Sequence, residues 1–282
     1  MRKYSNNKAI FIAGGSGLVG TNLAQELKNI KANFTASYFS KIKEKSLKKF
    51  YKKYNFLNFK DCLNATKNKY AVIILAVQGS GIKSLKNNFL KNFEKNLLIR
   101  SNLLKSCYKN KVKKIIWVSS STVYQPLSKP IKEDQINLNL NPYDVYFGTG
   151  WQYRYLEKLF EYYEKYMNMN INIIRTSSIY GLYDNFNEKK SHVVPALIKK
   201  LLTNKSKLEV WGDKKVTRDF VFANDLAKAI IVILNSSRKL KRIINFSSEK
   251  ATSIESLSKT LIKVSKRKKK IQFIKTMPSS AK

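Results

Sequence analysis

The sequence predicts an α/β protein built on a doubly wound parallel sheet, with a smaller C-terminal α/β lobe. Two continuous apolar runs, at 70–77 (YAVIILAV) and 114–119 (KIIWVS), are flanked by amphipathic stretches of helical length. Uninterrupted apolar strands that alternate with helices indicate a parallel sheet covered on both faces. A chain of 282 residues is long enough to bury a sizeable core of this kind.

The regular part of this alternation ends near residue 180. Strands are expected at Ala9–Ala13, Asn33–Ser37, Tyr70–Val77, Lys114–Ser119 and Asn170–Thr176. Helices are expected at Leu18–Lys28, Leu85–Lys109 and Thr149–Tyr166.

The pattern loosens after about Tyr180. Helices are expected there at Ser191–Leu202, Asn224–Leu234 and Ser253–Val264, and strands at Leu208–Trp211 and Arg242–Phe246. An Asn-Asp pair at 224–225 and Ser253 are suited to capping the second and third of these helices. No Gly/Ser linker separates the two parts, so we expect the second part to pack on the first.

The composition is strongly basic, with 55 Lys and Arg against 18 Asp and Glu and a net charge of +37. Such a charge attracts nucleic acid or phosphorylated ligands. Lysines recur along the whole chain, and only 263–270 (KVSKRKKK) forms a dense run. We therefore interpret the charge as spread over solvated faces, and we expect no nucleic-acid partner.

The chain lacks the marks of a secreted or membrane protein. Its two cysteines, Cys62 and Cys107, are too few for a disulfide scaffold and suggest a reducing compartment. No apolar run approaches the length of a membrane span, and the apolar stretch near the N-terminus is too short for a signal-peptide core. We expect a cytoplasmic protein with no membrane partner.

Residues 13–20 (AGGSGLVG) follow the first predicted strand and open the first predicted helix. They fit G-x-G-x-x-G from Gly15 and G-x-x-G-x-x-G from Gly14. Glycines permit a tight turn, the approach of backbone to a pyrophosphate, and close helix packing, while the helix N-terminus offers N–H donors. This context favours a Rossmann-type dinucleotide site over a ligand-free turn. It makes residues 1–180 a dinucleotide-binding domain and 181–282 a substrate-binding lobe.

The cofactor is expected to be NADP, with NAD as the alternative. An enzyme that uses NAD usually has an acid after the second strand, but none stands between Glu26 and Glu44. Ser40 and Lys41 stand there instead and can hold a 2′-phosphate, unless Lys41 is simply one of many surface lysines. The residues expected at the cofactor are Gly14, Ser16, Gly17, Leu18, Val19, Gly20, Ser40, Lys41 and Ala76.

Further motifs occur at 119–124 (SSSTVY), 175–181 (RTSSIYG), 211–213 (WGD), 218–221 (RDFV) and 225–227 (DLA). With the glycine loop, they make the chain resemble the extended short-chain dehydrogenases, the NAD(P)-dependent epimerase/dehydratase family. The resemblance implies an oxidoreductase or epimerase that moves hydride between the nicotinamide and a sugar carbon. It also implies Ser120 as the catalytic hydroxyl, and no metal.

A narrower similarity follows Gly181. The segments 184–186 (DNF) and 191–198 (SHVVPALI) are similar to stretches of GDP-L-fucose synthases. This branch implies a nucleotide-diphosphate sugar as the substrate and His192 as an acid/base. The residues expected at the substrate are Thr122, Asn185, Lys200 and Arg218.

Two of these residues can also be judged by their own chemistry. His192 is the only histidine of the chain and can exchange a proton near neutral pH, although a lone histidine is more often structural. Arg218 can donate two hydrogen bonds to a phosphate. The competing interpretation of Arg218 is a surface ion pair with an acid such as Asp219.

The family's proton-exchanging Tyr and the Lys four residues later are not both present. If Tyr146 is the acid, Gly150 stands at the Lys position. If the alignment starts from the stretch G-W-x-x-R-Y-x-E, Thr149 replaces the Tyr and Tyr153 replaces the Lys. We assign the catalytic role to Tyr146.

Three outcomes stay open for a chain with this departure. In the first, Tyr146 acts from one turn earlier, with Tyr153 on the same helix face seven residues later and with Arg154 or a lysine elsewhere supplying the charge. In the second, the enzyme is slow or its chemistry is altered. In the third, the protein binds a nucleotide or RNA and catalyses nothing. Thr122 stands where fucose synthases carry an epimerising Cys, which favours reduction, or epimerisation at the oxidised carbon. The family commonly dimerises through the helices that match 85–109 and 149–166, so we expect a homodimer. The family usually continues beyond the last residue here, so we expect an incomplete substrate lobe.

Overall fold

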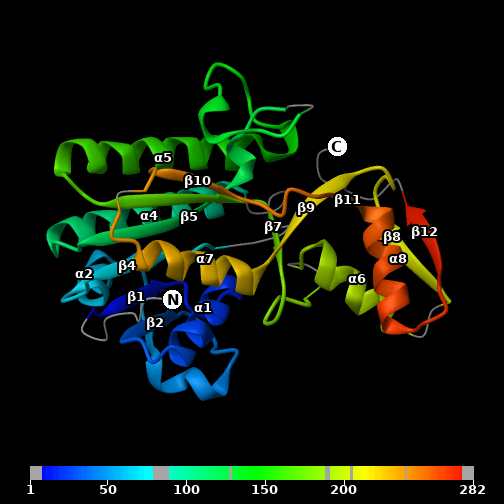
Figure 1. Ribbon diagram of the computed structural model, residues 1–282, viewed down its shortest axis with the longest axis horizontal. Coiled ribbons are helices and arrows are strands. Elements are labelled where there is room, and N and C mark those ends of the chain that lie inside the picture. Colours follow the sequence, from blue (N-terminus) through cyan, green and yellow to red (C-terminus); the bar gives the residue numbers. More distant parts are fainter. Residues whose placement is uncertain are drawn as a thin grey trace.

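The computed structural model describes residues 8–78, 89–126, 129–187, 191–203, 206–238 and 240–274. Its central feature is a seven-stranded sheet in the order β10-β6-β5-β4-β1-β2-β3, in which every neighbouring pair is parallel (Figure 1). The strands are β1 (Ile10–Ala13), β2 (Phe34–Tyr38), β3 (Tyr51–Lys53), β4 (Ala71–Ile74), β5 (Lys114–Ser120), β6 (Ile171–Thr176) and β10 (Ile243–Phe246). The predicted doubly wound parallel sheet is confirmed.

Helices cover both faces of this sheet because successive side chains of each strand point to opposite sides. The flanking helices are α1 (Leu18–Asn29), α2 (Phe59–Thr66), α4 (Phe89–Lys109), α5 (Phe147–Met167) and α7 (Ala223–Asn235). In β1, Ile10 and Ile12 pack into the core with α1 and α7, whereas Phe11 and Ala13 pack into the core with α2, α4 and α5. Both layers are visible in Figure 1.

The second lobe has its own small core. It contains a three-stranded sheet in the order β11 (Ala251–Ser253), β9 (Thr217–Phe222) and β7 (Ser178–Tyr180), and a parallel pair of β12 (Lys270–Ile274) and β8 (Lys207–Trp211). The helices α6 (Val193–Leu201) and α8 (Ile254–Ser265) pack beside these strands. Leu197, Leu208, Val210 and Ile254 form part of their shared apolar core.

The chain returns from the second lobe to complete the first sheet. β10 pairs with β6, so that Ile243 lies opposite Ile173, and α7 packs on α1. Leu226 and Ile230 of α7 are fully buried in this contact layer. β10 therefore belongs to the first sheet and α7 to its helix layer, although the sequence pattern assigned all of 181–282 to the substrate-binding lobe.

Two predicted helix caps have different outcomes. Ser253 accepts a hydrogen bond from the Ser256 amide at 3.0 Å, which confirms it as the cap of α8. The predicted Asn-Asp cap of α7 is wrong, because the N-cap residue is Phe222. Asn224 instead donates a hydrogen bond to the Glu26 side chain at 3.1 Å and so ties α7 to α1.

The strand expected at 70–77 is shorter than predicted. β4 ends at Ile74, because residues 75–78 leave the sheet and cross the glycine loop. The first residues of the helix expected at 85–109 lie outside the described residues, and α4 begins at Phe89. Short 3-10 helices are also present at η1 (Lys45–Phe50), η2 (Ser121–Val123), η3 (Glu133–Gln135) and η4 (Asp144–Tyr146). Among the described helices, none combines the length and the apolar character that a membrane span requires.

Candidate active site at the carboxyl edge of the sheet

The glycine loop connects the carboxyl end of β1 to α1, which is where ligands bind in open α/β sheets. Gly14 has a φ of +90°, and a Cβ added to it would lie 2.6 Å from the Ala76 amide nitrogen. At Gly20 an added Cβ would overlap the backbone of Gly14 and Gly15. These two glycines are therefore required by the turn and by the close approach of the helix to the loop.

Gly17 has a different environment. An added Cβ there meets only the Gly14 carbonyl oxygen, at 3.2 Å, so the face of the loop at Gly17 is open. The amides of Ser16 and Gly17 already donate to Ser37 and Gly14, at 3.2 and 3.1 Å. The first-turn amides of Leu18–Gly20 lie at the helix N-terminus, where the N-cap residue Gly17 has no side chain to accept their hydrogen bonds. An open cradle beside helix N-terminal amides fits the pyrophosphate of a dinucleotide.

Three hydroxyl groups hold the glycine loop in place. The Ser37 hydroxyl accepts a hydrogen bond from the Gly14 amide at 2.8 Å, and Tyr51 donates to the Gly15 carbonyl at 2.9 Å. Thr21 donates to the Gly17 carbonyl at 2.8 Å. Burial raises the pKa of Tyr51 to about 12, so Tyr51 stays a proton donor at neutral pH. The sequence reasoning missed these residues, because only the fold brings β3 under the loop.

The loop after β2 carries the two residues expected at the 2′-phosphate. Ser40 and Lys41 are both exposed at this edge of the sheet. Lys43, by contrast, turns back and donates a hydrogen bond to the Tyr183 carbonyl. Burial lowers the pKa of Lys43, and the neighbouring charge of Asp184 opposes that shift. Lys43 thus links the cofactor side of the site to the segment after Gly181.

Ser120 ends β5 and caps the 3-10 helix η2. Its hydroxyl oxygen accepts hydrogen bonds from the amide and the hydroxyl of Thr122, at 3.2 and 3.0 Å. Because both of these groups donate to Ser120, the proton of the Ser120 hydroxyl is left to point elsewhere. Thr122 therefore orients Ser120 as a donor at the carboxyl edge of the sheet.

The start of α5 carries the residues that the two alternative alignments place at the Tyr and Lys positions. Tyr146 is half-buried and immediately precedes α5, and no hydrogen bond joins it to Ser120 in the described residues. A Cβ added at Gly150 would lie 2.5 Å from the Thr122 carbonyl oxygen, so there is no room for a lysine at 150. Tyr153 lies one turn further along, stacked on Trp117 of β5.

A buried ion pair fixes the strands behind Ser120. Arg175 of β6 contacts Glu157 of α5 at 2.7 Å, and both side chains are almost fully buried. Glu157 also accepts a hydrogen bond from Ser119 at 2.7 Å, and Arg175 donates to the Tyr124 hydroxyl at 2.7 Å. Burial lowers the pKa of Arg175, but the bonds to Glu157 more than offset this, so its pKa is raised. The resembling motifs at 119–124 and 175–181 thus meet in one polar network.

The segment after Gly181 carries Asn185 and leads to His192. Leu182 is tied to α1, because the Asn22 side chain donates to its carbonyl at 3.0 Å. Burial raises the pKa of Asp184, while the Asn185 amide and the charges of His192 and Lys43 oppose the rise. His192 is exposed at the N-cap position of α6. The electrostatic interaction with Asp184 indicates that His192 lies near residues 182–185.

The two remaining candidate residues lie on the second lobe. Lys200 of α6 donates to the Glu209 carbonyl at 3.0 Å, and its ammonium lies 4.3 Å from the ring centre of Trp211. Arg218 lies on β9 and donates to the neighbouring Thr217 carbonyl. The acid proposed as its ion-pair partner, Asp219, accepts hydrogen bonds from Ser177, Ser248 and Glu249.

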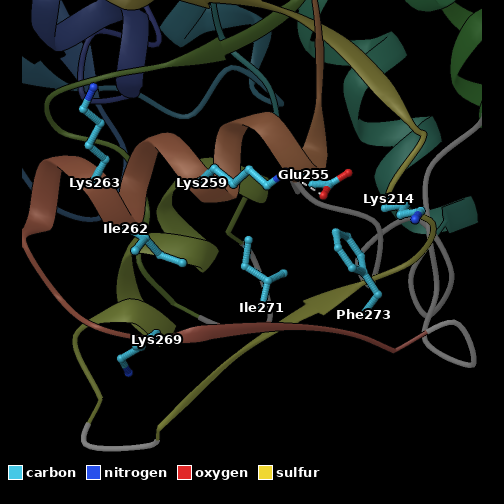
Figure 2. A pocket seen from close by; sticks show the side chains of 8 residues that line it. All are labelled: Lys214, Glu255, Lys259, Ile262, Lys263, Lys269, Ile271 and Phe273. Atoms are coloured by element: carbon cyan, nitrogen blue, oxygen red, sulfur yellow. Dashed lines mark ion pairs between the residues drawn. The ribbon is translucent and has the colours of Figure 1, made fainter.

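The hollow in Figure 2 lies apart from this edge, between α8 and β12 of the second lobe. It has a volume of about 550 Å³, and an ion pair between Glu255 and Lys259 at 2.9 Å stands at its rim. Its lining residues are Lys214, Glu255, Lys259, Ile262, Lys263, Lys269, Ile271 and Phe273. It contains none of the residues expected at the cofactor or the substrate.

Comparison with known proteins agrees with this arrangement. The NAD dependent epimerase/dehydratase family matches residues 10–246. A GDP-L-colitose synthase of Yersinia pseudotuberculosis is 29% identical over 244 residues, which are 84% of this chain and 75% of that protein. A GDP-L-fucose synthase of Sinorhizobium fredii is 26% identical over 247 residues, which are 84% of this chain and 74% of that protein. A solved GDP-L-fucose synthetase of Naegleria fowleri bound to NADP has a TM-score of 0.80 and 20% identity, and the match covers 99% of this chain and 84% of that chain. The chain belongs to the NAD dependent epimerase/dehydratase family.

Proposed function

We propose that the protein is an NADP-dependent nucleotide-sugar epimerase or reductase similar to GDP-L-fucose synthase. The observation that carries this proposal is the open face at Gly17 beside the first-turn amides of α1. The relatives support the substrate class, since they are GDP-sugar synthases. Ser40 and Lys41, exposed after β2 where no acid stands, support NADP over NAD. The NADP-bound structural relative is consistent with that choice.

The proposed chemistry divides among three side chains. A bound nicotinamide cofactor supplies or accepts the hydride. Ser120, oriented by Thr122, keeps its proton and donates a hydrogen bond to the reacting sugar oxygen. Tyr146 exchanges a proton with that oxygen from the start of α5, and His192 moves a proton at a neighbouring carbon. Asp184 lies within electrostatic range of His192.

The nucleotide-diphosphate sugar is proposed to bind between the sheet edge and the second lobe. Asn185 follows the segment that Lys43 and Asn22 tie to the cofactor side. Lys200 and Arg218 contribute positive charge for the diphosphate. The threonine at 122 favours simple reduction, or epimerisation at the oxidised carbon, over epimerisation at two carbons beside a ketone.

We also propose that the protein forms a homodimer through α4 and α5. Large apolar side chains are exposed on these two helices, namely Leu98, Tyr108, Tyr155, Tyr162 and Tyr166. Exposed aromatic residues that gather on adjacent helices favour burial against a second copy.

Turnover of a GDP-linked 4-keto sugar tests the proposal directly. We expect the protein to oxidise NADPH in the presence of this substrate. The loss of absorbance at the nicotinamide band measures this reaction. Ser120→Ala is expected to lower the rate about 100-fold without changing NADPH binding, since one preorganised donor to the reacting oxygen is lost. Ser121→Ala, a neighbouring exposed serine, is the matched control and should keep the full rate.

A second candidate function is dinucleotide binding without catalysis. The packing of Gly150 against Thr122 favours it, because that packing excludes a lysine from this position. NADPH binding with no turnover of any GDP- or UDP-linked sugar would support this alternative and refute the enzymatic proposal.

A further inference from the structure

Arg100 of α4 is a buried cation without a carboxylate partner. Its side chain is 2% exposed, and no carboxylate of the described residues lies within ion-pair distance. Its one short hydrogen bond is donated to the Tyr153 hydroxyl at 2.9 Å. Its contacts to Asn96 and Gln152 are long, at 3.4 and 3.5 Å, and its Nε is buried with no partner. Burying a charge is costly unless it is paired and hydrogen-bonded, and a charge held in this way is a candidate for a functional role.

A chain of contacts links α4, the helix that carries Arg100, to the glycine loop. Ala76, in the segment after β4, lies against Gly14. Two residues later the backbone of Gln78 is held by the Asn96 side chain, through bonds of 2.7 and 2.9 Å. Asn96 precedes Arg100 by one turn of α4, and Figure 1 shows α4 and α5 running side by side. The guanidinium therefore sits where α4, α5 and the strand-end segment over the loop come together.

The hydrogen bond from Arg100 also determines the direction in which the Tyr153 hydroxyl can donate. Because Arg100 donates to the phenol oxygen, the phenol proton must point away from the guanidinium, and it has no acceptor among the described residues. The ring is held between Trp117, at 5.7 Å between ring centres, and the Arg100 guanidinium, at 4.8 Å. Tyr153 is thus a fixed hydroxyl donor backed by a positive charge.

Tyr153 is also the residue that replaces the family's lysine in the register based on G-W-x-x-R-Y-x-E. Its position on α5 lacks a cation, and the cation is supplied from α4 instead. In the family that the chain resembles, this lysine binds the nicotinamide ribose. We propose that Arg100 and Tyr153 together take its place, with Tyr153 donating to a hydroxyl of the nicotinamide ribose and Arg100 acting as the positioning residue that orients the phenol. This inference rests on the proposed function, because it assumes a nicotinamide cofactor.

Variants that remove the positive charge from position 100 of α4, or transfer it to position 153 of α5, test the proposed roles of Arg100 and Tyr153. The variants are Arg100→Met, Arg100→Lys and the double variant Arg100→Met with Tyr153→Lys, and Arg242→Met is the control. Arg242 contacts α5 as well, but at Glu161 and Glu164 near its other end. The readouts are the Kd of NADPH from nicotinamide fluorescence, the rate of hydride transfer, its pH profile and the melting temperature.

We expect Arg100→Met to weaken NADPH binding about 10-fold and to slow hydride transfer about 100-fold, as for loss of a preorganised donor. Arg100→Lys, and the double variant that returns a lysine to α5, should recover binding to within about threefold of the original. The pH profile should shift in Arg100→Met and return in the double variant, whereas Arg242→Met should change neither.

Three results would overturn the inference. One is unchanged NADPH binding and hydride transfer in folded Arg100→Met. Another is a folded double variant that binds NADPH no better than Arg100→Met or, if Arg100→Met does not fold, about 10-fold more weakly than the unsubstituted protein. The third is an original protein that binds no NADPH, which would remove the proposed function as well, whereas the first two results leave the proposed function standing.

Discussion

Gly17→Val is expected to abolish NADPH binding while the protein stays folded. The variant should fold because a Cβ added at Gly17 meets only the Gly14 carbonyl oxygen, at 3.2 Å, and the space beyond it is open. A branched side chain would therefore occupy the cradle that a pyrophosphate needs, and would cover the first-turn amides of α1. We expect NADPH affinity to fall at least about 100-fold, as for removal of several charge-assisted hydrogen bonds. Nicotinamide fluorescence titration gives the affinity, and circular dichroism gives the fold.

The matched control is Asn29→Val at the opposite end of α1, where the residue is exposed. It adds the same side chain to the same helix and should leave the NADPH affinity unchanged. If Gly17→Val bound NADPH as tightly as this control, the cofactor would have to lie elsewhere, and the assignment of the loop would be wrong.

Glu157→Ala is expected to cause the largest loss of stability among single substitutions at the site. It would leave Arg175 buried with its charge unpaired and would remove the acceptor of the Ser119 hydroxyl. Breaking a buried ion pair from one side costs about 3–5 kcal/mol of the free energy of unfolding. Urea unfolding measures this loss of stability. We also expect Ser120, at the end of β5, to lose its fixed position in this variant.

Glu161→Ala is the control for that measurement. Glu161 lies one turn further along α5 and pairs with Lys158, Lys165 and Arg242, which are all more exposed than Arg175, so its loss should cost less than the loss of Glu157. The double change Glu157→Leu with Arg175→Met removes both charges and should recover part of the stability. Equal stability of Glu157→Ala and Glu161→Ala would show that the buried pair does not hold the two strands together.

The sheet could be predicted because its signals are local. Apolar runs at β1, β4, β5 and β6 are continuous, and the glycine loop has a fixed relation to β1 and α1. The return of 223–246 could not be predicted, because β10 is a short, half-buried strand whose partner β6 lies about 70 positions earlier in the chain. Local patterns contain no information about which edge such a strand joins.

Only part of the candidate site could be predicted from the sequence. Motifs predict Ser120 and the glycine loop as parts of the site, since their residue types and spacing are typical of the chemistry. The residues that hold these segments in place could not be predicted from the sequence. Ser37, Tyr51 and Lys43 act through contacts that only the fold creates. The sequence also expected Arg154 or a lysine to supply the missing charge. Arg154 instead donates to two backbone carbonyls, so we place that charge on Arg100.

Calorimetric titration of NADPH at rising salt tests the central claim most directly. A chain with a net charge of +37 attracts any polyanion, but that attraction is screened as salt increases. A dinucleotide cradle predicts one NADPH per chain, binding that persists at physiological salt, and weaker binding of NADH. Heat that disappears with salt and is the same for NADPH, NADH and inorganic pyrophosphate would contradict a specific cofactor site.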